Sequence, residues 1–112
     1  MRFMMFVATD SDPDPKAEAP GEVETWVDDV DSRGKRITGD RLRPAGAAKT
    51  VRVRGGQKMV TDGPFTESKE VIIGFDILEC DSMDEAIEIA ARHPMARAGR
   101  LEVRAFWPFE EE

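Results

Sequence analysis

Apolar residues recur along the first third of the chain at spacings that predict one strand and one helix. Residues 2–8 are apolar and rich in large side chains, and turn-forming residues follow them, which is typical of a buried strand. Beyond Gly21, four apolar positions are spaced at i, i+3, i+4 and i+7: Val23, Trp26, Val27 and Val30. This spacing places them on one helical face, and we expect the helix to end near Gly34.

A tight hairpin is predicted near the middle of the chain. Gly55 and Gly56 stand between two alternating segments in TVRVRGGQKMVT, residues 50–61, the pattern of a two-residue turn joining antiparallel strands. Counting outward from the turn gives the expected pairs: Arg54 with Gln57, Val53 with Lys58, Arg52 with Met59 and Val51 with Val60. Residues 35–46 before it are typical of a short strand and a loop.

The second half of the chain predicts a central strand, a helix and a last strand. Residues 71–80 are nearly all apolar, so both faces of this strand need cover. Ser82 and Glu85 form a capping box for a helix that should stop before Pro94. Residues 101–107 then alternate as a strand that ends at the following proline.

The element order is therefore β-α-β, a hairpin, and β-α-β. Two amphipathic helices on one face of one antiparallel sheet indicate an α+β fold, a ferredoxin-like βαββαβ sandwich with an extra β-hairpin, in a single domain spanning residues 1–112. Phe106 and the row from Ile72 to Leu78 would then lie on the opposite face, which stays apolar. We therefore expect a homodimer that packs sheet against sheet.

Composition narrows the classes of function. The net charge of −7 argues against direct nucleic-acid binding, although nine bases between Ser32 and Lys58 could hold an anionic ligand or pair with the acidic segment before them. Cys80 is the only cysteine, and no apolar run approaches the roughly 20 residues that span a membrane. These features predict a soluble cytoplasmic protein. No cofactor fingerprint or metal-ligand set is present in the sequence, so we expect neither.

The segment DGPF, residues 62–65, has two interpretations. In the structural one, Asp62 caps the following backbone N–H groups, Gly63 accepts unusual dihedral angles, and Phe65 fills a gap in the core. In the functional one, Asp62 points into a cleft as a carboxylate base, and Phe65 lines a ligand site.

The charged residues after DGPF are ambiguous in the same way. Glu67, Lys69 and Glu70 can form a charge network that fixes the loop against a neighbouring segment or the partner subunit. Alternatively, Lys69 binds a carboxylate or phosphate while Glu67 orients it. Asp76 is an acid inside an apolar strand, where an unpaired carboxylate would be costly. It either faces a solvated cavity or pairs with an arginine such as Arg104, and we favour pairing or exposure at an edge.

His93, Trp26 and Arg43 complete the set of candidate site residues. His93 is the only histidine and can either stabilise the end of the second helix or act as an acid in catalysis. Trp26 and Trp107 are most simply interpreted as residues of the core or of a dimer interface. The alternative for Trp26 is that it lines a pocket. Arg43 belongs to the basic segment and could hold an anionic substrate.

The segment DGPFTESKEVIIGF resembles the signature of the YCII-related family, DGPF type. The opening RFMMFVA, the GDRLRP segment, the Gly-Gly hairpin, SMDEAIEIAARHP and LEVRAFWP resemble family landmarks in the same order. The resemblance implies a dimeric α/β barrel with a ligand cleft between the sheet and the first helix. It also implies an association with sigma factors of the extracytoplasmic-function type.

The chain departs from the wider family at its His–Asp dyad. The resemblance would place the histidine on the first helix and the aspartate before a proline at the end of the second. Here the first helix has no histidine, and His93 stands before Pro94 where the aspartate would fall. Dyad chemistry is therefore not transferred to this chain.

Two functions follow from the sequence. The favoured one is a binding or regulatory module that recognises a small ligand, with an anion as one candidate, or a protein such as a sigma factor. The alternative is a small-molecule enzyme of the lyase or isomerase kind, with Asp62 as base, His93 as acid, and Arg43 or Lys69 holding an anionic substrate.

Overall fold

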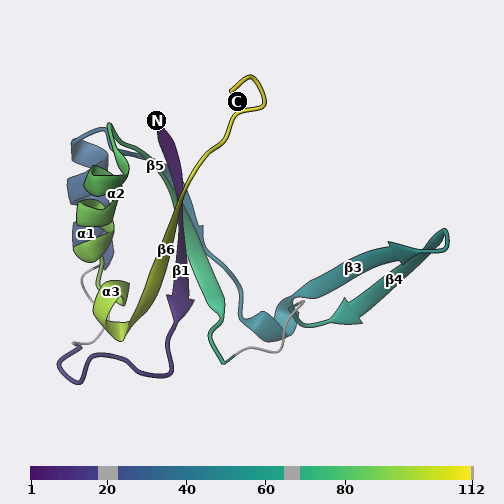
Figure 1. The fold of residues 1–112 in the computed structure, drawn as a ribbon. Helices are drawn as coiled ribbons and strands as arrows, with labels where there is room; N and C mark the ends of the chain where they lie inside the picture. The colour runs from purple at the N-terminus through teal and green to yellow at the C-terminus, as the bar shows by residue number, and fades with distance from the viewer. Residues whose placement is uncertain (18–22, 65–68, 112) are drawn as a thin grey trace.

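The computed structural model describes residues 1–17, 23–64 and 69–111. These residues form a mixed α+β fold built on an antiparallel sheet with the strand order β2-β5-β1-β6. The strands of this sheet are β1 (Arg2–Thr9), β2 (Arg36–Arg41), β5 (Ile72–Glu79) and β6 (Gly99–Ala105). The helices α1 (Val23–Ser32), α2 (Met83–Ala91) and α3 (Met95–Ala98) all lie on one side of it (Figure 1). This arrangement is consistent with the ferredoxin-like fold predicted from the sequence.

The core lies between the helices and one face of the sheet. Alternate residues of β1 point toward the helices, and Phe3 and Met5 are completely buried there. Leu78 on β5 lies opposite Phe3 and is buried with it, while Trp26 and Val30 cover them from α1. The predicted helical face of α1 is thus confirmed.

The orientation of β5 differs from the sequence prediction. The row containing Gly74, Asp76 and Leu78 is the buried one and faces the helices, whereas Phe75 and Ile77 lie half-buried on the opposite face. Apolar periodicity could not distinguish the two faces because both rows of this strand are apolar. The helix-facing row contains the small Gly74 and a paired Asp76, which leaves room beneath α1.

The second helix begins as the capping box predicts. Ser82 Oγ accepts the Glu85 backbone N–H at 3.1 Å, and Glu85 Oε1 accepts the backbone N–H of Asp81 at 3.0 Å. Two details were not predicted: the short helix α3 follows Pro94, and β6 occupies residues 99–105, so that Trp107 lies beyond the strand and is 77% exposed.

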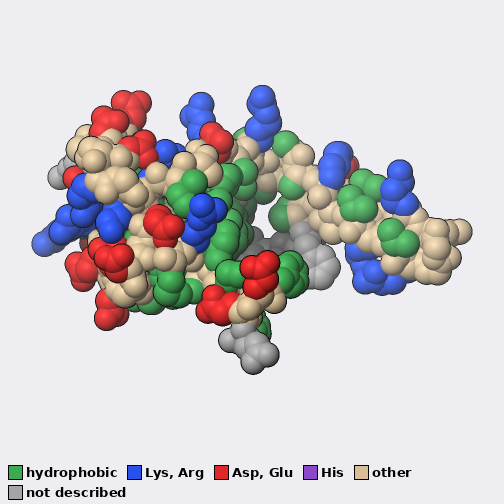
Figure 2. Space-filling model, turned by 90° about the horizontal axis from the view of Figure 1, so that it is seen from above, with side chains coloured by type: hydrophobic (Ala, Val, Ile, Leu, Met, Phe, Trp, Pro, Cys, Tyr) green, Lys and Arg blue, Asp and Glu red, His purple; other side chains and the backbone are tan. Residues whose placement is uncertain are grey.

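The hairpin forms an arm that projects from the body (Figure 1). The turn η1 (Ala45–Ala47) leads into β3 (Lys49–Arg54) and β4 (Gln57–Asp62), which pair only with each other and in the predicted register. The Cα radius of gyration is 16.2 Å, against about 13 Å for a compact chain of this length. Both strands of the arm are largely exposed, and apolar and basic side chains alternate along it (Figure 2).

Candidate functional site

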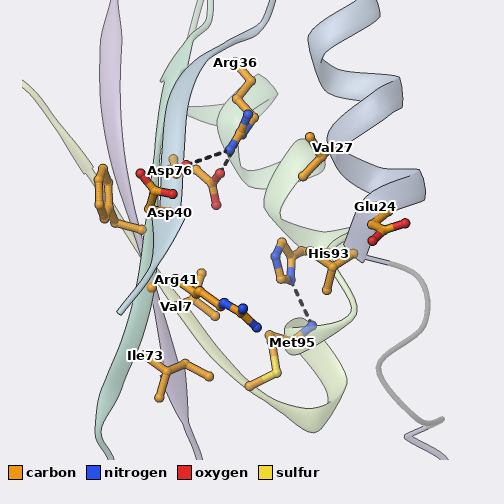
Figure 3. Close-up of a pocket in the computed structure, with 14 residues that line it drawn as sticks. Val7, Glu24, Val27, Arg36, Asp40, Arg41, Ile73, Asp76, His93 and Met95 are labelled. Carbon is orange, nitrogen blue, oxygen red and sulfur yellow. Dashed lines mark hydrogen bonds and ion pairs between the residues drawn. The ribbon is translucent and has the colours of Figure 1, made fainter. Parts of the chain in front are cut away.

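A cavity of about 710 Å³ lies between α1 and the β2–β5 side of the sheet (Figure 3). Its apolar wall comes from Val7, Val23, Val27 and Met95. Its polar residues come from α1, β2, β5 and the segment between α2 and α3, elements that are far apart in the sequence. Few polar groups on a mainly apolar wall are typical of small-molecule sites.

An ion pair forms the floor of the cavity. Arg36 Nε donates to Asp76 Oδ1 at 2.7 Å, and Arg36 Nη2 donates to the Gly39 carbonyl at 3.0 Å. Asp76 is 7% exposed, and burial raises the pKa of its carboxyl, while the Arg36 guanidinium opposes that rise. The predicted pairing with an arginine is confirmed, but the partner is Arg36 and not Arg104.

Gly39 makes this ion pair sterically possible. It lies opposite Asp76 in the β2–β5 register, and a Cβ at this position would clash with the Asp76 carboxylate and lie 2.7 Å from the Phe75 carbonyl oxygen. A side chain at this position would therefore displace the carboxylate from Arg36.

His93 closes the other side of the cavity beside α1. His93 is 5% exposed, and its ring packs edge-on against Trp26, with ring centroids 4.7 Å apart. The Nδ1 atom accepts the Met95 backbone N–H at 3.0 Å. Burial lowers the pKa of His93 to about 4, so the ring is neutral at pH 7.

The hydrogen bond to Nδ1 fixes the tautomer of His93. Since Nδ1 uses its lone pair as an acceptor, the neutral ring must carry its proton on Nε2. Nε2 has no hydrogen-bond partner among the described residues. Every side-chain polar atom that is fully enclosed in this part of the chain does have a partner, so Nε2 must be accessible from the cavity. His93 thus presents an N–H donor to anything bound there.

We predict that His93 makes the fold less stable in acid. Its pKa is about 4 in the folded protein, against about 6.5 unfolded, so between these values the unfolded chain binds more protons. The stabilisation is fully present above about pH 6.5 and is lost as the pH falls toward about 4, a change of about 2 kcal/mol after allowance for solvent in the cavity. Urea unfolding at pH 7 and pH 4.5 measures it.

The matched variant for this prediction is His93→Asn, whose side-chain oxygen can still accept the Met95 N–H. Asp76 acts with the opposite sign, because its raised pKa favours protonation in the folded state, but it is common to both proteins and cancels in the comparison. Equal losses of stability in the wild type and the variant would contradict the burial of a neutral imidazole.

Arg41 is a further charged residue that lines the cavity. It is the last residue of β2, and its guanidinium extends from the sheet toward Met95, below the His93 ring (Figure 3). The Arg41 guanidinium makes no hydrogen bond or ion pair with any residue that the structure describes.

The structure separates the site residues that the sequence grouped. Asp62 lies at the base of the arm, where its side chain is 82% exposed and pairs with Lys49, and it does not line the cavity. Gly63, at φ +90°, donates its N–H to the Ala48 carbonyl and its carbonyl accepts the Thr50 hydroxyl. Asp62 and Gly63 therefore make contacts at the base of the arm, where the Asp62 side chain pairs with Lys49.

The other candidates are distributed as follows. His93 lines the cavity, and Trp26 supports it from the core by donating its indole N–H to the Ile89 carbonyl at 2.9 Å. Arg43 and Lys69 are exposed and do not line the cavity. Phe65 and Glu67 lie outside the described residues.

Arg36, Gly39 and Arg41 were missed as site residues. Their only sequence signal is their place in a basic segment, because the pairing of β2 with β5 that aligns Gly39 with Asp76 spans a long loop. No group of three or more metal-binding side chains is found among the described residues, and none of their helices is long and apolar enough to cross a membrane.

Comparison with known proteins shows similarity to individual proteins, among them the following two. An uncharacterised protein of Rhizobium meliloti (strain 1021) is 48% identical over 50 residues, which are 45% of this chain and 40% of that protein. The other is the structure of 5-chloro-2-hydroxyhydroquinone dehydrochlorinase (TftG) from Burkholderia phenoliruptrix AC1100, in complex with 2,5-dihydroxybenzoquinone. It covers 100% of both chains at 17% identity with a TM-score of 0.42, which carries no argument about activity.

The match to a family is far more extensive. The YCII-related domain matches residues 1–110, nearly the whole chain. This protein therefore belongs to the YCII-related family.

Proposed function

We propose that this protein is a small-molecule-binding module whose ligand occupies the cavity between α1 and the sheet. The observation that supports this most directly is the open Nε2 of the buried His93, which faces a cavity that also contains the Arg36–Asp76 pair. A buried polar group without a protein partner is costly unless water or a ligand satisfies it. The cavity volume of about 710 Å³ suits a small organic molecule.

An enzyme is the second candidate, and one observation favours it. Asp76 and His93 line the same cavity, and both have shifted pKa values, a combination that is common in active sites. The carboxylate available to a substrate there would be Asp76 rather than Asp62. Turnover of a bound compound, lost in Asp76→Asn, would support this function over simple binding.

A thermal-shift screen of small metabolites tests the binding site. At ten times its Kd, a ligand raises the free energy of unfolding by about 1.4 kcal/mol, or roughly 4 to 8 °C in Tm. We expect Val27→Trp, which fills the cavity from α1, to abolish the shift of any compound that stabilises the wild type. Asp62→Asn on the arm should keep the shift.

The opposite pattern would place the ligand elsewhere. A shift that survives Val27→Trp but disappears in Asp62→Asn would locate the site at the DGPF segment and overturn the cavity proposal. The basal Tm of each variant, measured without ligand, separates loss of binding from loss of folding.

We also propose that the protein is a homodimer in which the arm contacts a second copy. Val51 and Val60 pair across the arm and both remain exposed in the single chain. Neighbouring exposed apolar side chains are typical of protein–protein contact surfaces. Sedimentation should give a dimer for the wild type and a larger monomer fraction for Val51→Asp. A monomeric wild type would exclude this role for the arm. Sigma-factor binding rests on the family resemblance alone.

A further inference from the structure

Arg41 is an exposed residue on the wall of the cavity, and no described residue neutralises its positive charge. The neighbouring Arg36 is paired with Asp76 at 2.7 Å and also contacts Asp31 at 3.5 Å. The Arg41 guanidinium, in contrast, has no ion pair or hydrogen bond to a described side chain or backbone group. A guanidinium has five donors and no acceptor, and its fork geometry suits a carboxylate.

The nearest carboxylates of the cavity do not face Arg41. Asp40 and Arg41 are consecutive on β2, so their side chains leave the strand on opposite sides. Figure 3 shows the Asp40 carboxylate on the far side of the strand, and Glu24 on α1 turned outward from the cavity. Asp76 is already bound by Arg36. The charge balance around Arg41 therefore favours an anion.

His93 adds a second donor on the opposite wall. Its Nδ1 is occupied by the Met95 N–H, so the group presented to the cavity is the Nε2–H. Arg41 from the sheet and His93 from the α2–α3 connection thus both offer donors, and neither offers an acceptor.

We propose that the ligand of this cavity is an organic carboxylate, held between the Arg41 guanidinium and the His93 Nε2–H; the proposal rests on the small-molecule site proposed above. The carbon skeleton of the ligand packs against Val23, Val27 and Met95, which form the apolar wall. In this arrangement His93 is a neutral hydrogen-bond donor, and the charge is supplied by Arg41 alone.

Matched pairs of carboxylates and amides test the proposal. The probes are benzoate with benzamide, and cyclohexanecarboxylate with cyclohexanecarboxamide, titrated into ¹⁵N-labelled protein at pH 7. Each pair shares its skeleton and differs in charge. We expect the carboxylates to bind at least tenfold more tightly, and Arg41→Gln to remove that preference. Arg43→Gln, an arginine of the same segment outside the cavity, should keep it.

The imidazole of His93 gives an independent readout, since the chain has no other histidine. Carboxylate binding should shift the Nε2–H signal and leave the proton on Nε2. His93→Asn, which retains an acceptor for the Met95 N–H, should weaken the carboxylates more than the amides.

The outcomes distinguish the carboxylate proposal from the more general proposal that the cavity binds a small molecule. If carboxylates and amides bind equally and Arg41→Gln changes neither, the carboxylate subsite is wrong while the cavity remains a binding site. If the probes bind but perturb no cavity residue, or if none of the four binds, the carboxylate proposal also fails. Only the thermal-shift screen with Val27→Trp then decides whether the cavity binds another class of molecule.

Discussion

Replacing Asp76 with alanine is expected to lower the free energy of unfolding by about 3 kcal/mol. The substitution removes the carboxylate that accepts from Arg36 Nε at 2.7 Å and leaves a guanidinium facing the cavity with a single weaker carboxylate contact, to Asp31. The cost lies mainly in the charge that has lost its partner rather than in the lost attraction, because the pair itself must be desolvated to form. Urea unfolding at pH 7 and fixed protein concentration measures the change.

The double variant Asp76→Ala, Arg36→Met tests that explanation. The double variant leaves no unpaired charge at the floor of the cavity. It should therefore be more stable than Asp76→Ala alone by about 1 kcal/mol or more, which is the size of effect measured when buried ion pairs are replaced by apolar residues. The single variant Arg36→Met completes the comparison. If the stability lost by the double variant equals the sum of the losses in Asp76→Ala and Arg36→Met, the two side chains act independently.

Trp26→Ala is expected to cost about 3 to 5 kcal/mol of stability, the usual range for removing a buried aromatic ring. Trp26 lies on the buried face of α1, and its indole N–H donates to the Ile89 carbonyl at 2.9 Å. Its ring packs edge-on against the His93 ring. The same unfolding assay applies, and the His93 imidazole signal should also move because its packing partner is gone.

Two further tryptophan variants control this result. Trp26→Phe keeps most of the packing and loses the hydrogen bond, so its cost should be about 1 to 3 kcal/mol. Trp107→Ala, at a position 77% exposed, should cost no more than about 0.5 kcal/mol. A larger loss at Trp107 than at Trp26 would refute the assignment of the core.

The elements that the sequence predicted are those with a strong local period. The i, i+3, i+4, i+7 spacing from Val23 to Val30 and the alternation around Gly55 report directly on which side chains share a face. The buried face of β5 was assigned wrongly because both of its rows are apolar, so the local pattern carries no information about which one meets the helices.

The site was less accessible to sequence reasoning. The need of Asp76 for an arginine follows from its apolar strand, but the choice of Arg36 depends on the alignment of β2 with β5, which brings together residues 40 positions apart. His93 was recognised as a candidate, yet its buried environment depends on packing against Trp26, which is far from it in the sequence. The hydrogen bond from Met95, two residues away, is local. The combination of Asp62 with His93 failed for the same reason, since Asp62 belongs to the arm.

The measurement that tests the central claim most directly is chemical-shift mapping of the compound giving the largest thermal shift with the wild type. We predict perturbations at the His93 imidazole and at the methyl groups of Val23, Val27 and Met95, which surround the cavity. Perturbations concentrated at Asp62 and Gly63, with the cavity methyl groups unchanged, would contradict the account and place the ligand site at the base of the arm.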